Sequence, residues 1–67
     1  MLNGLKIREL RNMKGYTTLD MSKFTHISKS YIEELERGDK VNPAFNKVVY
    51  LAQVLGVKVD DLILRTE

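Results

Sequence analysis

Hydrophobic residues recur at helical spacing along the chain, and polar stretches containing Gly or Pro divide them into short segments. Near the N-terminus, Ile7 and Leu10 fit an amphipathic helix over about residues 3–14, and Gly15 is placed to end it. Arg11 falls beside the apolar face of this helix, while most of its other polar residues face water. The first segment is therefore predicted to pack one side against a core.

A second amphipathic region lies in the C-terminal half. Asn42 suits the N-cap, and Pro43 suits the first position, of a helix that continues over about residues 44–55, with Gly56 after it. Its apolar stripe consists of Phe45, Val48, Leu51, Ala52 and Leu55. A last short helix is predicted over about residues 59–64, with two acids in its first turn. The pattern predicts an all-α fold.

Residues 17–38 are the stretch around which the rest is organised, and they predict two short helices joined by a tight turn. Thr17 can cap the first helix, with Asp20 three residues on in a near-match to a capping box. The helical pattern breaks around His26, which is the residue there best suited to a positive φ. This layout is that of a helix-turn-helix DNA reader.

The second helix of this pair has distinct inner and outer faces. Ser28 is expected to cap it and Gly38 to end it. At about 100° per residue, Ile32, Leu35 and Glu36 share the inner side. The outer face is polar and able to form hydrogen bonds; it consists of Ser30, Glu33, Glu34 and Arg37, with Lys29 and Tyr31 on its flanks.

Several groups of residues match a known family in type and spacing. They are Gly-Tyr-Thr at 15–17, residues 27–32 and 35–38, Asn-Pro at 42–43, and residues 51–57 and 61–63. With them the chain resembles the Cro/C1-type (XRE) helix-turn-helix family over about residues 4–64. The resemblance implies a compact five-helix bundle of the lambda-repressor-like DNA-binding type, with the helix-turn-helix at its second and third helices. At 67 residues, the chain is expected to be a single domain over residues 1–67.

The resemblance also implies a structural ion pair between Arg11 and Glu36. Independently, an inward-facing glutamate needs a partner if it is buried; the alternative is that both charges reach solvent. The chain departs from the family at three positions. Thr18 stands where a phosphate-holding Gln is usual, His26 where a turn Gly is usual, and Lys58 where a Ser usually caps the fifth helix.

The third helix, about residues 29–37, is expected to enter the major groove of DNA. The residues expected to meet base edges are Lys29, Ser30, Glu33 and Glu34, with lysine donating to guanine and glutamate accepting from cytosine. The residues expected to hold phosphates are Thr17, Thr18, Tyr31, Arg37, Lys40 and Asn42. Two acids on a helix that faces DNA would be repelled by the phosphates. Either the affinity for DNA comes from other parts of the chain, or Arg37 neutralises Glu33 four residues away.

Charge and composition fit this interpretation. Residues 1–32 carry six Lys or Arg against two acids, whereas residues 33–67 carry five against seven, within a net charge of +2. A basic half is typical of proteins that bind polyanions such as DNA. Taken alone, this charge distribution is explained equally well by ordinary solvent-exposed lysines and arginines. The chain has no cysteine, no apolar run long enough to cross a membrane and no recognisable signal peptide. A cytoplasmic protein is expected.

Catalytic chemistry is not predicted. His26 is the only histidine, and without a cysteine or a second histidine it cannot build a metal site or a nucleophile–base pair. The adjacent acids Glu33–Glu34 and Asp60–Asp61 point in different directions, and there is no Gly-rich phosphate loop. We therefore expect neither an enzyme nor a bound cofactor or metal.

The leading hypothesis is a sequence-specific regulator of transcription, most often a repressor in such families, that binds double-stranded DNA. It is expected to act as a homodimer on a palindromic operator, with exposed apolar residues such as Tyr50 or Leu64 serving the partner subunit. The alternative is a protein-interaction module, such as an antitoxin or an adaptor that reuses the fold. The acids on the outer face and the short Thr18 favour this alternative modestly.

Overall fold

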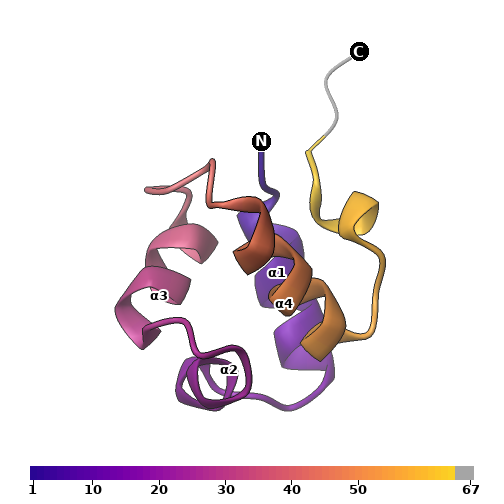
Figure 1. Cartoon of the computed structure of the whole chain (residues 1–67). Helices are drawn as coiled ribbons and strands as arrows, with labels where there is room; N and C mark the ends of the chain where they lie inside the picture. Colours follow the sequence, from indigo (N-terminus) through magenta and orange to yellow (C-terminus); the bar gives the residue numbers. More distant parts are fainter. Residues whose placement is uncertain (65–67) are drawn as a thin grey trace.

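The computed structural model describes residues 1–64 and shows an all-helical chain (Figure 1). Its elements are α1 (Gly4–Met13), α2 (Thr18–Thr25), α3 (Lys29–Arg37), α4 (Phe45–Leu55) and a 3-10 turn, η1 (Val59–Leu62). Among the described residues there is no strand, only an isolated antiparallel bridge between Leu2 and Ile63. The predicted all-α class is confirmed.

One core holds the four helices and η1 together. α2 packs against α3 and α4, α1 against α3 and η1, and α4 against η1. The fully buried side chains come from every element: Ile7, Met21, Ile32, Leu35, Leu51, Leu55 and Leu62. Since every helix contributes to this core, the angle between α2 and α3 is fixed by the whole scaffold rather than by the turn alone.

The predicted fifth helix is wrong, since the segment forms only the four-residue 3-10 turn η1. The chain leaves helical geometry at Ile63, which is extended at φ −97° and ψ 128°. There it pairs with the N-terminal segment: Asn3 N donates to Leu62 O at 2.7 Å, and Leu64 N donates to Met1 O at 2.8 Å. These bonds between the two ends of the fold replace the bonds that would continue a helix.

The start of α4 also differs from the prediction. Ala44, not Asn42, is the N-cap, and it makes no side-chain capping bond. The preceding loop is held by the N-terminal segment, because Leu2 N donates to Val41 O at 2.8 Å. This contact holds the loop at residues 41–44 outside any helix, so α4 begins two residues later than predicted. Phe45 then lies in the first turn, beyond the core, and is 72% exposed instead of lining the apolar stripe.

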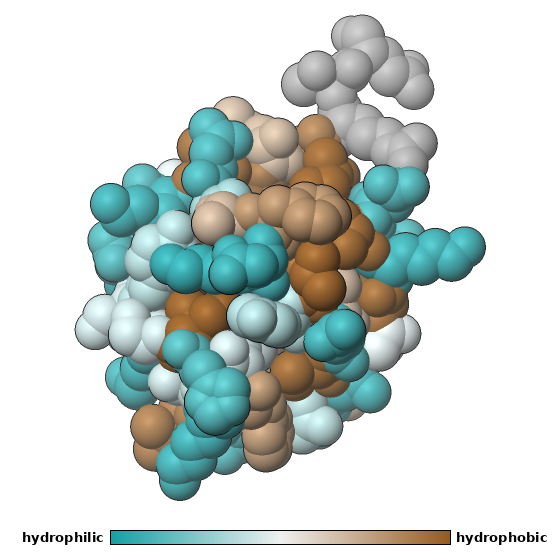
Figure 2. Space-filling model, in the orientation of Figure 1, coloured by the Kyte–Doolittle hydropathy of each residue, from teal (hydrophilic) through white to brown (hydrophobic). Residues whose placement is uncertain are grey.

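The two sides of the molecule differ in polarity. In the orientation of Figure 1, hydrophilic side chains cover most of the side that holds α3, whereas apolar ones surface mainly toward α4 and η1 (Figure 2). Tyr50 and Leu64 are exposed there, while Val49 and Val59 are half-buried. No helix in the described part of the chain is long and apolar enough to span a membrane.

Candidate nucleic-acid interface

The turn between α2 and α3 is built without glycine. His26 takes the left-handed conformation at φ 61°, as predicted, and its N–H donates to Ser22 O at 2.9 Å. The buried Thr25 hydroxyl donates to Met21 O at 2.7 Å and accepts from Ile27 N at 3.2 Å. These bonds satisfy the polar groups of a tight turn inside the fold, and so fix where α3 begins relative to α2.

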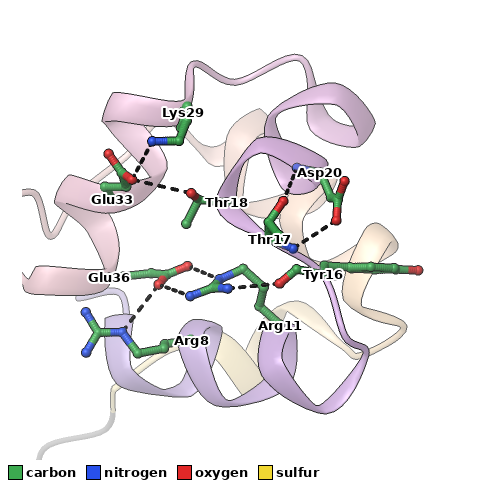
Figure 3. Close-up of polar contacts among 9 residues, drawn as sticks. All are labelled: Arg8, Arg11, Tyr16, Thr17, Thr18, Asp20, Lys29, Glu33 and Glu36. Atoms are coloured by element: carbon green, nitrogen blue, oxygen red, sulfur yellow. Dashed lines mark hydrogen bonds and ion pairs between the residues drawn. The ribbon is translucent and has the colours of Figure 1, made fainter.

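Both helices of the pair start with the predicted caps. The Thr17 hydroxyl accepts from Asp20 N at 3.0 Å, and the Asp20 carboxylate accepts from Thr17 N at 2.9 Å (Figure 3). This is a complete capping box made with aspartate instead of glutamate. At α3 the Ser28 hydroxyl accepts from Tyr31 N at 3.2 Å. The N-termini of α2 and α3 are therefore rigid, with remaining N–H groups that suit an anion.

The cap on α2 makes stability depend on pH. The pKa of the Asp20 carboxyl lies below its ordinary value, chiefly because the backbone N–H of Thr17 donates to it. Its contribution is present above the unfolded pKa of about 4 and is lost as the pH falls through the lower, folded pKa. In urea unfolding, wild type should therefore exceed Asp20→Asn in stability at pH 6, and the difference should shrink at pH 3. A difference that stays constant over that range would contradict this account.

α3 buries one face and presents the other. Ile32, Leu35 and Glu36 are buried, as the helical spacing predicted. Lys29, Ser30 and Arg37 are exposed, whereas Tyr31, Glu33 and Glu34 are half-buried. The Tyr31 ring lies 4.3 Å from Lys47 Nζ of α4, so this side chain is held at the flank of the helix. The outer face of α3 is polar from its first residue to its last.

Glu36 anchors α3 to α1 through two arginines. Its carboxylate accepts from Arg11 Nε at 2.7 Å and Nη2 at 2.9 Å, and from Arg8 Nε at 3.4 Å (Figure 3). Arg11 also donates to Tyr16 O at 2.9 Å, which adds the loop before α2. The Glu36 side chain is only 3% exposed and that of Arg11 13%. The bond to Glu36 raises the pKa of Arg11, and the pair joins α1, the α1–α2 loop and α3.

A second polar cluster joins α2 to the outer face of α3. Glu33 accepts from Lys29 Nζ at 2.9 Å and from Thr18 Oγ1 at 3.3 Å (Figure 3). The bond from Lys29 is the main reason why the pKa of Glu33 lies below its ordinary value. The partner of Glu33 is thus Lys29 and not Arg37, which instead donates to Asp39 at 2.9 Å. Arg37 has a closer acid in the loop that follows α3.

The other residues predicted to hold phosphates are more dispersed. Thr17 begins α2 beside Thr18, but Lys40 and Asn42 lie in the loop beyond the C-terminal end of α3. Both are exposed, and Lys40 N donates to Glu34 O at 3.3 Å. The structure therefore brings Thr17, Thr18 and the start of α3 together, and it places the loop at the other end of the same helix.

Sequence reasoning missed one basic residue at this surface. Arg8, one of the polar residues of α1 that were expected only to face water, helps to line a polar depression of about 260 Å³ between the first three helices. The other lining residues are Arg11, Thr18, Glu33, Glu36 and Arg37. The spacing of Arg8 three residues before Arg11 was the available signal, because it places both on one side of α1.

The described residues contain no group of three or more His, Asp or Glu side chains that could hold a metal ion, and the sequence has no cysteine. Every buried side-chain nitrogen or oxygen in the described part of the chain has a hydrogen-bond partner. The polar residues are therefore arranged to shape a surface, with caps and ion pairs holding the two helices that present it.

Comparison with known proteins gives a consistent result. A family model described as helix-turn-helix matches residues 7–62. The chain is 37% identical over 59 residues to the uncharacterized HTH-type transcriptional regulator YazB of Bacillus subtilis, covering 88% of this chain and 84% of that protein. It is 36% identical over 58 residues to the HTH-type transcriptional regulator DdrOP3 of Deinococcus deserti, covering 87% of this chain and 44% of the relative.

A solved structure extends the likeness to three dimensions. The crystal structure of SinR, a master regulator for biofilm formation, in complex with DNA has a TM-score of 0.85 and 30% identity to this chain. The match covers 90% of this chain and 98% of that one. The chain spans about half the length of the curated proteins DdrOP3 and SinR, at 44% and 54%.

Proposed function

The chain belongs to the Cro/C1-type (XRE) helix-turn-helix family, and from this premise we propose that it is a sequence-specific transcriptional regulator that binds double-stranded DNA and acts as a repressor. The observation that carries the proposal is α3 itself. Its inner face is locked into the core through Ile32, Leu35 and Glu36, while its outer face stays polar and accessible. A rigid helix of this kind can enter the major groove with its first residues against the base edges.

The contacts follow from where the side chains lie. Lys29 and Ser30, exposed at the start of α3, and Glu33 and Glu34 one turn on are proposed to meet base edges. Phosphates are proposed to bind at three places. They are the N-terminus of α2 with Thr17 and Thr18, Tyr31 on the flank of α3, and Arg37 at the end of α3 with Lys40 and Asn42 of the following loop. Together these would set the register of α3 in the groove.

We further propose that two copies act together on a palindromic operator in the cytoplasm. A twofold dimer would place two α3 helices in half-sites about one helical turn apart, ~10 bp. The exposed apolar side chains of α4 and of the segment after η1, Phe45, Tyr50 and Leu64 among them, support a surface for the second copy.

Two substitutions separate base reading from phosphate binding. Ser30→Ala should change which sequence is preferred and leave the salt dependence of binding as it is. Lys40→Ala should weaken binding to all duplexes and reduce the slope of log K against log salt by about 0.9, the loss of one phosphate contact. Equilibrium titration of a duplex panel by fluorescence anisotropy at several salt concentrations measures both. An unchanged sequence preference for Ser30→Ala would remove it from the base contacts.

A protein-interaction module remains the second candidate, favoured by the acids Glu33, Glu34 and Asp39 on and beside the outer face of α3. Charge of this sign suits a basic protein partner better than a polyanion. The same titrations distinguish the two candidates. DNA binding that falls steeply with salt supports the regulator. No binding to any duplex at low salt supports the module.

A further inference from the structure

The Glu33 cluster ties up groups that a DNA-binding surface would use. Lys29 is the cation at the start of α3, and the Thr18 hydroxyl stands near the N-terminus of α2, where the first phosphate contact is expected. Both donate to one carboxylate oxygen, Glu33 Oε2, at 2.9 Å and 3.3 Å. In the free protein, then, both donors are directed at the Glu33 carboxylate (Figure 3).

DNA can break the ion pair between Lys29 and Glu33. The Lys29 side chain is 51% exposed and that of Glu33 35%, and ion pairs this exposed contribute little to stability. Breaking this ion pair, however, leaves Glu33 exposed to repulsion. If Lys29 turns to a phosphate, the Glu33 carboxylate is left without its main partner beside a polyanion. Repulsion then offsets the new contact unless DNA offers Glu33 a hydrogen-bond donor in exchange.

Base pairs differ in their ability to make that exchange. In the major groove, cytosine presents an amino group that a glutamate can accept from, and guanine presents O6 and N7 that a lysine can donate to. Lys29 and Glu33 lie one helical turn apart on α3, so a site rich in G·C pairs can satisfy both at once. A phosphate alone can satisfy only the lysine.

We propose that Glu33 is a specificity-determining residue that withholds Lys29 and Thr18 from DNA of unrelated sequence and releases them at a site with a cytosine amino group. This inference rests on the proposed DNA-binding function. On this proposal, Glu33 lowers the affinity for every duplex that lacks the matching base. It thereby increases the ratio of the affinity for the operator to the affinity for DNA of unrelated sequence.

Glu33→Gln tests the proposal, and Glu34→Gln controls for the loss of one negative charge on the random-sequence pool only, because Glu34 is itself proposed to meet a base edge in the selected duplex. Both variants remove one negative charge from α3, but Glu34 makes no ion pair with any described residue. Each protein, checked for its fold by circular dichroism, is titrated against a random-sequence duplex pool and against the duplex that wild type selects. Dissociation constants are measured at 50, 100 and 200 mM KCl, as in studies of counterion release.

On the random pool, Glu33→Gln should bind more tightly than Glu34→Gln and show a steeper salt dependence. With one added phosphate contact, the fold-loss of affinity between 50 and 200 mM salt should be about three to four times larger for Glu33→Gln than for Glu34→Gln. Adding Lys29→Met to Glu33→Gln should remove this increment, because Lys29 is the released cation. The ratio of random-pool to selected-duplex dissociation constants should fall for Glu33→Gln, because binding to the random pool tightens while the glutamine oxygen accepts from the cytosine amino group more weakly than the carboxylate does.

Three results would overturn the proposal, and they are distinguishable. Equal salt slopes for Glu33→Gln and Glu34→Gln, with wild type binding its selected duplex normally, would remove the role of Glu33 and leave the proposed function intact. If the steeper salt dependence of Glu33→Gln persists after Lys29→Met is added, Lys29 is not the cation that Glu33 keeps from the phosphates. Wild type that binds the random pool at no salt concentration, and therefore selects no duplex, would remove the proposed function and this inference with it.

Discussion

Replacing Glu36 by glutamine should lower the free energy of unfolding by about 3–5 kcal/mol, the usual cost of removing one partner from a buried ion pair. The carboxylate is almost inaccessible and accepts two bonds from Arg11 and a longer one from Arg8. Its loss leaves the guanidinium of Arg11, itself only 13% exposed, without a counter-charge. For a domain of this size, a loss of about 3 kcal/mol corresponds to a fall in Tm of roughly 12–24 °C.

The matched control removes both charges together. Arg11→Met combined with Glu36→Leu should be less destabilising than either single change, since no buried charge is then left alone. Urea unfolding followed by circular dichroism compares Glu36→Gln with wild type, and a double-mutant cycle of wild type, Arg11→Met, Glu36→Leu and the double variant gives the coupling. If Glu36→Gln unfolds within about 0.5 kcal/mol of wild type, the range of ordinary surface changes, the pair does not hold α3 to α1.

Replacing Gly4 by alanine should be the second most damaging change, at about 3 kcal/mol, the upper end for overpacking. A Cβ at this position would overlap the backbone carbonyl of Leu35 and come within 3.1 Å of that of Glu36. Carbonyls inside α3 cannot move aside as a flexible side chain can, so α1 must shift away from α3 as a whole. Helix propensity predicts the opposite sign, because alanine is the better helix former.

Gly15→Ala is the control for Gly4→Ala. Gly15 has φ +73°, so alanine there is strained, but nothing lies within 4 Å of the added atom. The cost should be about 1–2 kcal/mol, that of placing an L-residue in the left-handed region. Thermal unfolding ranks the two. Gly4→Ala as stable as wild type, or more stable, would mean that the close approach of α1 to α3 is not required.

The sequence was most informative where structure is decided locally. Caps depend on residues three apart, and helical faces on a repeat of 3.6, so the capping roles of Thr17 and Ser28 and the inward side of α3 followed from the chain alone. The left-handed His26 was predictable too, since the helical pattern breaks over residues 25–27 and His is enriched at positive φ over most non-Gly residues.

Prediction was wrong where contacts distant in sequence decide. Leu2 and Asn3 donate to Val41 and Leu62, respectively, and these bonds delay the start of α4 and cut the last helix to a single turn. No local pattern contains that information. The partner of Glu33 is a different case, because it is decided locally. Lys29 and Arg37 lie four residues to either side of Glu33, a symmetry that the sequence alone does not resolve, and Arg37 pairs instead with Asp39, two residues along the chain.

The candidate site combines both kinds of information. Its residue types were evident from the sequence, because a polar outer face opposite a buried inner face is a local property of α3. The connection of Thr18 to Glu33, and of both to the depression beside Arg8, exists only once α1, α2 and α3 are assembled. It is this assembled surface that the function proposed here uses.

The most direct test of that function is selection of bound duplexes from a random DNA library at moderate salt, using the whole chain. The account predicts an enriched palindrome whose half-sites lie about one helical turn apart, ~10 bp. An enriched single half-site would retain sequence reading by α3 but contradict the proposed dimer. No enrichment, with only weak and salt-sensitive binding to all duplexes, would contradict the central claim that the outer face of α3 reads DNA sequence.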